Sequence, residues 1–231
     1  MVLTNDITFN RTKNPNHSNE IFHIIQELLL TTSMYQKNDI EINKTLSQKG
    51  YVIGNHSVDT LKTWINNHIN QIFVAQQNHE NLNKIIGFVL LLNSEPIRKQ
   101  VFQYGLDTKF LDEDSEQVFK SKKFSYLIQI GVKPQFQGKN IGSSLLQTVY
   151  ERTNKPIISY VMTSPITNFP SVYFHLKNGF LYNGDYFGGF AGFPNYKSAC
   201  FIYHPNAKLP TKNIIEERYS ELLKSQSIAN K

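Results

Sequence analysis

Apolar and polar residues recur along the chain with two different periods, which predict strands and helices in alternation. Short apolar runs and period-two alternation predict strands at residues 7–11, 71–77, 84–93, 124–132, 157–162, 180–187 and 197–203. Apolar residues at helical spacing, several of them behind a capping residue, predict helices at residues 18–29, 57–68, 142–153, 171–177 and 213–223. Two strand pairs read as hairpins, so the pattern favours an α/β fold with a mixed, mostly antiparallel sheet and helices on both faces.

Three stretches carry weaker patterns. Residues 34–56 are polar and Asn-rich, which predicts a loop with some helix. Residues 94–123 follow no clear period and separate two predicted strands, so we interpret them as an insertion or a long mobile loop. The chain is therefore expected to form one domain over residues 1–205, with the insertion at 94–123 and a C-terminal tail at 206–231 that contains a helix.

Composition narrows the class of protein without identifying it. The 231 residues are 40% hydrophobic and 18% charged, as in ordinary globular proteins. The single cysteine, Cys200, excludes an internal disulfide and lies in an apolar strand, so we interpret it as a core residue. The longest apolar run, residues 85–92, is too short to span a bilayer, and the first ten residues lack the pattern of a signal peptide. We therefore expect a cytoplasmic protein without a membrane partner. Its many Asn, Lys and Ile residues suggest a bacterial source.

The net charge of +6 has two interpretations. It describes either a solvated basic surface or a surface that attracts an anionic ligand. Lysine and arginine are scattered, and no motif of the usual nucleic-acid-binding modules occurs, so a nucleic-acid partner is not expected. The histidines show no metal-ligand spacing, and no metal is expected.

The most informative segment runs from Tyr126 to Phe180. An apolar strand ends at Val132 and is followed by the turn Gln137–Gly142, at the end of which a helix begins. Such a turn directs several backbone N–H groups and the positive end of a helix dipole to one point, which is a binding geometry for a phosphate or pyrophosphate. The segment therefore predicts a phosphate-bearing ligand.

Two signatures in this segment resemble those of the GNAT superfamily of N-acetyltransferases. The first, V-x-P-x-x-(Q/R)-x-x-G-x-(G/A), is matched at Val132, Pro134, Gln137 and Gly142, with Asn140 in place of the central glycine. The second, N-x-x-(A/S)-x-x-(F/L)-Y-x-x-x-G-F, is matched at Asn168, Ser171, Phe174, Gly179 and Phe180, with His175 in place of tyrosine. Asn tolerates left-handed backbone angles better than most residues, so the first turn can survive its substitution.

The resemblance implies acetyl-CoA as co-substrate and assigns roles to individual residues. The turn would bind the pyrophosphate, and the strand would offer backbone groups to the pantetheine arm, with Asn168 and Ser171 as further contacts. The implied cofactor-binding residues are Ile130, Gly131, Val132, Gln137, Gly138, Lys139, Asn140, Ile141, Gly142, Ser143, Asn168 and Ser171. Strict alternation along the strand would place Tyr126, Ile128 and Ile130 on one face and Leu127, Gln129 and Gly131 on the other.

Acetyl transfer to an amine needs a base for the amine and an acid for the departing thiolate. The strand Phe124–Val132 contains no carboxylate where many family members have a glutamate, so the base is unassigned, with water, a residue of another strand and Asp185 as candidates. The acidic run Asp112, Glu113, Asp114 and Glu116 could reach the site only if the insertion folds over it, and we interpret it as a solvated charge run. His175 occupies the position of the family tyrosine, and we hypothesise that it protonates or hydrogen-bonds the CoA sulfur. The alternative is a helix histidine that packs beside CoA without a chemical role.

The sequence leaves the acceptor open. The aromatic and glycine-rich stretch Tyr182–Tyr196 lies where the family forms part of its acceptor pocket, but its aromatic residues are equally compatible with a core. We expect direct transfer to a primary amine of a small molecule, with a protein amine as runner-up. A non-catalytic CoA-binding module and a transferase for longer acyl chains are the alternatives. A homodimer is compatible with the exposed sheet edges and the tail.

Overall fold

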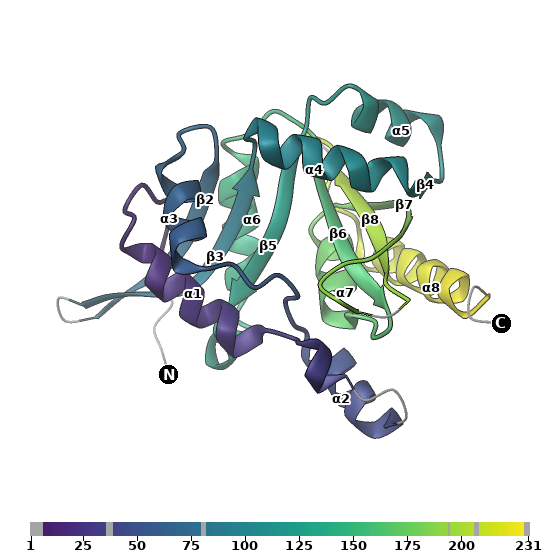
Figure 1. The fold of residues 1–231 in the computed structure, drawn as a ribbon, viewed down its shortest axis with the longest axis horizontal. Coiled ribbons are helices and arrows are strands. Elements are labelled where there is room, and N and C mark those ends of the chain that lie inside the picture. The colour runs from purple at the N-terminus through teal and green to yellow at the C-terminus, as the bar shows by residue number, and fades with distance from the viewer. Residues whose placement is uncertain (1–6, 36–38, 80–81, 194, 206–207, 229–231) are drawn as a thin grey trace. The chain divides into compact units, whose positions relative to one another are not determined.

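The computed structural model describes residues 7–35, 39–79, 82–193, 195–205 and 208–228, which form two compact units. The first unit comprises the residues up to Leu29 together with Val52–Ile97 and Tyr126–Asn154. The second comprises Leu30–Tyr51, Arg98–Ser125 and the residues from Lys155 onward. The predicted α/β fold with a mixed, mostly antiparallel sheet is confirmed (Figure 1).

The first unit is a layered α/β structure. Its strands β1 (Ile7–Arg11), β2 (Gln71–His79), β3 (Leu82–Leu92) and β5 (Ser125–Val132) are antiparallel neighbours in that order. Its helices are α1 (His17–Leu28), α3 (Val58–Asn66) and α6 (Ile141–Tyr150), and a 3-10 turn, η3, covers Pro134–Phe136. Each strand and helix was predicted within a few residues, and residues 80–81 of the turn between β2 and β3 lie outside the described residues.

Alternation along the strands divides the apolar residues of this unit between two faces. On one face, the core combines residues of α1 and α3 with alternate residues of β2 and β3: Ile21, Ile24, Ile25, Leu61, Ile65, Ile72, Val74, Phe88, Leu90 and Leu92. Helix α6 packs against β1, β2 and β3. Gly87 of β3 faces Leu145 of α6 so closely that an added Cβ would lie 3.3 Å from that side chain.

The second unit contains the strand order β6 (Ile157–Ser164), β8 (Lys197–Tyr203), β7 (Leu181–Phe187) and β4 (Thr108–Phe110), with antiparallel pairing throughout. Its helices are α2 (Ile40–Lys49), α4 (Glu95–Leu106), α5 (Glu113–Lys120), α7 (Phe169–Lys177) and α8 (Lys212–Ile228), and a 3-10 turn, η2, covers Thr32–Met34. Helix α7 packs against α2 and α8. The predicted tail helix is therefore present as α8, while residues 206–207 at the predicted domain boundary lie outside the described residues.

The interpretation of residues 94–123 as a long loop is wrong. The segment forms α4, β4 and α5, and β4 extends the sheet by pairing with β7, with Lys109 opposite Asp185. The aromatic ring of Phe119 is buried and lies 5.5 to 5.7 Å from the rings of Phe102, Phe110 and Phe124. These contacts hold the segment within the second unit. Such contacts between distant residues leave no periodic pattern in the sequence.

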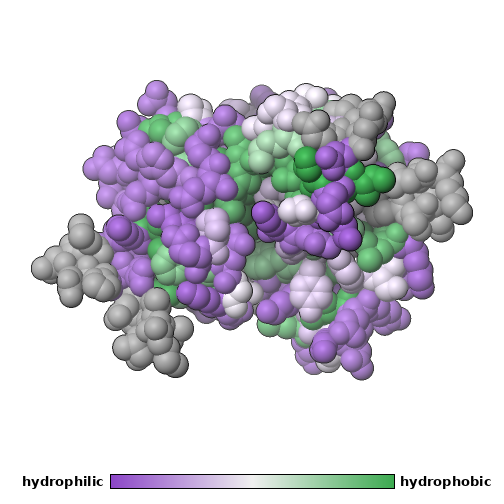
Figure 2. All heavy atoms as spheres, turned by 90° about the horizontal axis from the view of Figure 1, so that it is seen from below, coloured by the Kyte–Doolittle hydropathy of each residue, from purple (hydrophilic) through white to green (hydrophobic). Residues whose placement is uncertain are grey.

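The burial of Cys200 and the hydropathy of the surface agree with the expectations from the sequence. Cys200 is fully buried and burial raises the pKa of its thiol to about 12, which confirms a core residue rather than a nucleophile. The face shown in Figure 2 is largely hydrophilic with separate hydrophobic patches. Over the part of the chain that the structure describes, no helix combines the length and apolar character needed to cross a bilayer.

Candidate functional site

The turn between β5 and α6 has the geometry that its sequence predicted. Strand β5 ends at Val132, whose carbonyl accepts a hydrogen bond from Nε2 of Gln137 (3.1 Å). Gly138 and Asn140 both have left-handed backbone angles, with φ of 74° and 64°. The side chain of Asn140 forms no capping bond to α6, which begins at Ile141. The N–H groups of the first helical turn therefore have neither an intrahelical partner nor a side-chain cap.

This arrangement can bind an anion through backbone groups. Two left-handed residues separated by one other residue turn N–H groups of the turn towards one side of the chain. The adjacent N-terminus of α6 adds the positive end of a helix dipole. Open space surrounds the turn at Gly138, where an added Cβ would meet no atom within 4 Å. Lys139 lies in the same turn, with Nζ 5.2 Å from the centre of the Phe136 ring, and contributes a positive charge.

Strand β5 carries a bulge that changes which residues share a face. Gln129 is paired with Leu90, but Leu127 is paired with Leu91, so Ile128 is an extra residue in the ladder with β3. Neighbouring residues of β3 point to opposite faces, so Leu127 and Gln129 do so as well. The expectation from strict alternation, which grouped these two residues, is wrong. Ile130, Gly131 and Val132 lie beyond the bulge in regular pairing with Val89, Phe88 and Gly87.

Asn168 in the second unit is a structural cap. It precedes α7, and its Oδ1 accepts a hydrogen bond from the backbone N–H of Ser171 (3.2 Å). Its Nδ2 donates to the carbonyl of Tyr51 (2.8 Å), and the side chain is 5% exposed. Both ends of the amide thus bond to the protein. This geometry favours a role in fixing the start of α7 over a direct contact with CoA.

His175 is buried on α7 with both ring nitrogens engaged. Nδ1 lies 2.7 Å from the carbonyl of Ser171, which can only accept, so Nδ1 carries the proton. Nε2 lies 3.1 Å from Oγ of Ser159 on β6 and accepts from it. The rings of Phe180 and Phe201 lie 4.9 and 5.2 Å away.

Burial lowers the pKa of His175 to about 4, so the ring is neutral near pH 7 and a poor proton donor to a thiolate. Its geometry thus favours the interpretation of a packed histidine over the hypothesised acid.

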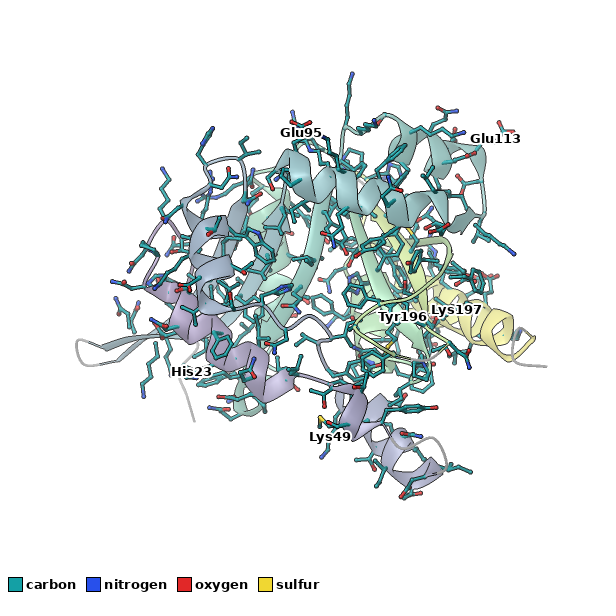
Figure 3. The ribbon with its side chains drawn as sticks, viewed as in Figure 1. His23, Lys49, Glu95, Glu113, Tyr196 and Lys197 are labelled. Carbon is teal, nitrogen blue, oxygen red and sulfur yellow. The ribbon has the colours of Figure 1, made fainter. Side chains whose placement is uncertain are left out.

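Asp185, a candidate base, is engaged in an ion pair. Its Oδ2 lies 3.2 Å from Nζ of Lys197, and both side chains are largely buried on the neighbouring strands β7 and β8. Lys197 is labelled in Figure 3. The acidic run at residues 112–116 also has a structural explanation. Asp112 caps α5 by accepting a hydrogen bond from the backbone N–H of Ser115, a bond that lowers the pKa of this carboxyl.

The aromatic stretch at residues 182–196 belongs in part to the core. Tyr186 and Tyr196 are buried, with their ring centres 6.1 Å apart, and the ring of Phe190 lies 5.4 Å from that of Tyr196. Tyr104 of α4 joins them, 5.4 Å from Tyr186. The cluster confirms the core interpretation for Tyr186 and Tyr196. No group of three or more potential metal ligands occurs among the residues that the structure describes.

The hydrophobic and polar pattern of the sequence did not predict a cluster of Gly54, His56 and Gln129 in the first unit. Nε2 of Gln129 donates to the carbonyl of Gly54 (2.7 Å), and the ring of His56 lies beside Gly54 and packs edge-on against Trp64. Gly54 and Gln129 are 75 positions apart in the sequence. Only the fold brings them together, and no local signal could have found them.

Comparison with known proteins agrees with this geometry. The sequence pattern of the acetyltransferase (GNAT) family matches residues 41–180, which is more than half of the chain. No curated protein sequence matches the chain.

Solved structures share the fold at low identity. An N-acetyltransferase from Staphylococcus aureus has a TM-score of 0.53 and 18% identity, covering 87% of this chain and 99% of that one. NAA60 from Arabidopsis thaliana, solved with a bisubstrate analogue, has a TM-score of 0.55 and 15% identity over 87% and 99% of the two chains. The ribosomal-protein-S18-alanine N-acetyltransferase from Escherichia coli has a TM-score of 0.51 and 13% identity over 90% and 97%.

Proposed function

Because the chain belongs to the GNAT family of acetyltransferases, we propose that it moves an acetyl group from acetyl-CoA to a primary amine by direct transfer. The observation that carries the proposal is the turn between β5 and α6. Its two left-handed residues and the uncapped start of α6 form a binding geometry for a pyrophosphate. The expected cytoplasmic location, bacterial source and homodimer remain predictions from the sequence.

Acetyl-CoA fits the residues present in this turn. The N–H groups of residues 138–143 would hold the pyrophosphate oxygens, and Lys139 would add a charge-assisted contact. Backbone groups of Ile130, Gly131 and Val132 would bind the pantetheine arm, in the manner of a strand added to a sheet edge. Gln137 contributes indirectly, since its side chain holds the turn against the carbonyl of Val132.

The transfer itself needs no covalent enzyme intermediate. The lone pair of the neutral amine attacks the thioester carbonyl carbon, a C–N bond forms, and the C–S bond breaks. The nitrogen loses a proton, and the CoA sulfur leaves as a thiolate that takes up a proton. The chain's contribution is to position the two reactants, which replaces an encounter in solution by a reaction within one complex.

The acceptor is proposed to be a small molecule, with a protein amine as the competing outcome of a screen. Asp185 is paired with Lys197, so this carboxylate is not a free base. We therefore assign deprotonation to water or to the acceptor's own free-base fraction. Membership of an acetyltransferase family argues against the alternative that the chain is a CoA-binding module without catalytic activity.

The first test is calorimetric titration of the purified protein with acetyl-CoA. Replacing Gly142 by leucine puts a branched side chain in the first turn of α6, where the phosphates would approach the backbone. We expect micromolar-range binding to the parent to weaken by about tenfold or more, as befits the loss of one or two charge-assisted hydrogen bonds. The matched control is Gln147→Leu on the exposed face of the same helix. Equal affinity in Gly142→Leu and the control, or no binding to the parent, would overturn the proposed site.

A further inference from the structure

Segment Arg98–Ser125 of the second unit folds back on itself, so that α4 and α5 form one surface. The structure describes every residue of this segment. The ring of Phe119, near the end of α5, stacks on Phe102 of α4 with 5.7 Å between ring centres, and Nζ of Lys122 lies 4.5 Å from the centre of the Phe102 ring. The end of α5 therefore lies beside the middle of α4 (Figure 1).

The exposed charged side chains of this surface divide by sign between its two ends. The basic end has lysines on the first half of α4 and at the end of α5: Lys99, Lys120, Lys122 and Lys123. The acidic end has carboxylates on both sides of β4, just after α4 and at the start of α5: Asp107, Asp112, Glu113 and Asp114. Lys109 of β4 is also exposed, but its Nζ lies 5.3 Å from the centre of the Phe187 ring on the neighbouring strand β7.

Uncharged side chains occupy the middle of the surface. Lys99, Gln103 and Leu106 of α4 are exposed and follow one another at i, i+4 and i+7, so they form one stripe along the helix. Gln117 is exposed in the middle of α5. Leu106, at the acidic end of the stripe, is 64% exposed and offers an apolar contact to a partner.

We propose that this surface binds the same surface of a second copy of the chain, related to the first by a two-fold axis through the uncharged middle. In a two-fold interface every contact occurs twice, once in each direction. The acidic end of each copy then meets the basic end of the other copy. A foreign basic or acidic partner would match only one end, so the charges favour a second copy. The interface is formed by two helices, and not by a sheet edge or the C-terminal tail.

The local charges have to overcome the charge of the whole chain. Its net charge is +6, so two copies repel one another at long range. The Debye length is about 10 Å at 0.1 M salt, which screens this repulsion more strongly than contacts a few ångströms long. At about 1 M salt the Debye length is about 3 Å, and the contacts are screened as well. Raising the salt over this range should therefore weaken the dimer.

The size of the surface predicts a weak dimer. Helices α4 and α5 contain 12 and 8 residues, which makes them about 18 and 12 Å long at 1.5 Å per residue. Two such helices cover less than the roughly 800 Å² per partner of a standard interface. We expect a dissociation constant in the micromolar range.

Sedimentation velocity of the full chain, from about 1 μM to about 1 mM, tests the proposal. The parent should shift from monomer to dimer over this range. One double variant, Lys122→Glu with Lys123→Glu, neutralises the basic end, and another, Glu113→Lys with Asp114→Lys, neutralises the acidic end. Each should raise the dissociation constant by about tenfold or more, because each change occurs in both contacts of the dimer.

The matched control changes the net charge by the same amount elsewhere. Lys62→Glu with Lys177→Glu alters exposed or partly exposed lysines of α3 and α7, and it should not weaken the dimer. Lys120 is left unchanged in all variants, because its Nζ lies 2.7 Å from Oε1 of Glu116 in the same helix. Thermal unfolding of each variant reports whether the fold is intact.

An equimolar mixture of the two double variants gives the decisive measurement. Each variant has lost the charge of one end, so neither should dimerise well alone. In the mixture, the intact acidic end of one copy meets the intact basic end of the other. The mixture should therefore form a heterodimer more tightly than either variant associates with itself, a recovery that a damaged fold cannot produce.

A pair of leucine variants tests the apolar part of the surface. Leu106→Ser should raise the dissociation constant by about threefold or more, since it removes an apolar contact from each half of the dimer. Leu209→Ser is the control, because Leu209 is equally exposed, at 61%, but lies outside this surface. Equal dimerisation of the two variants would exclude Leu106 from the interface.

Three results would overturn the proposal. A parent that stays monomeric throughout the series would do so, and binding of an oligolysine peptide to that monomer would assign the acidic end to a basic partner instead. A dimer that neither charge variant weakens would use another surface. A mixture without heterodimer would reject the pairing of acidic with basic ends. Acetyl-CoA binding is a separate readout, because this surface contains none of the residues proposed to bind the cofactor, and the charge variants should bind acetyl-CoA about as the parent does.

Discussion

At the scale of single residues, the two departures from the family signatures have different physical explanations. Asn140 has a φ of 64°, in the left-handed region where Asn is better tolerated than most non-glycine residues. That conformation was predictable, because the signature requires it and the substitution satisfies it. The environment of His175 was not predictable, since Ser159 and Phe201, which contact its ring, come from strands β6 and β8 and not from helix α7.

His175 should make the stability of the protein depend on pH. Its pKa is about 4 in the folded state and about 6.5 in the unfolded chain, so the unfolded state binds the proton more tightly. The stabilisation is complete above pH 6.5 and is lost as the pH falls towards 4. Between pH 7 and pH 5 the loss is about 2 kcal/mol. Urea unfolding at both values should show that His175→Gln removes about this much of the pH dependence.

The same variant separates structure from chemistry. The pKa of His56 is also lowered by burial, so this residue adds its own share to the pH dependence of the stability. His56→Phe measures that second share. An identical pH dependence in His175→Gln and the parent would contradict the buried, neutral assignment. A large loss of turnover with unchanged stability would instead support the hypothesis that His175 acts on the CoA sulfur.

At the scale of elements, predictability follows the range of the interactions that specify each segment. Helix α3 and strands β2 and β3 were predicted because caps and periodicity are local signals. Segment 94–123 was not, because its short strand β4 is stabilised by pairing with β7, about 75 residues further along the chain. The bulge at Ile128 was equally hidden, since it is defined by the register with β3.

Phe119 tests whether α5 is integral to the second unit. Its ring is 2% exposed and stacked on Phe124, and a Cβ at Gly105 would clash with it at 1.9 Å. Phe119→Ala should lower the free energy of unfolding by about 3–5 kcal/mol, measured by urea denaturation. Phe187→Ala is the control, because that ring is 43% exposed and should cost about 1 kcal/mol or less. Similar costs for the two variants would mean that α5 packs only loosely.

At the scale of the whole molecule, the net charge of +6 left two interpretations open. A diffuse basic surface attracts an anionic ligand from any direction, so any lost lysine would weaken acetyl-CoA binding equally. A local contact acts only near the turn, because charges farther apart than the Debye length, about 10 Å at 0.1 M salt, are screened. The two interpretations therefore differ in whether the position of the removed lysine affects acetyl-CoA binding.

Two variants of equal net charge decide the matter. Lys139 lies in the proposed pyrophosphate turn, whereas Lys62 lies on α3 and pairs weakly with Asp59. A charge pair about 5 Å apart in water is worth about 0.8 kcal/mol, so Lys139→Gln should weaken acetyl-CoA binding by about fourfold at low salt. Lys62→Gln should change the affinity by less than about twofold. Calorimetric titrations at low and high salt should show the difference between the variants shrinking as salt rises. Equal losses in both variants would assign the attraction to the net charge of the molecule and remove Lys139 from the phosphate site.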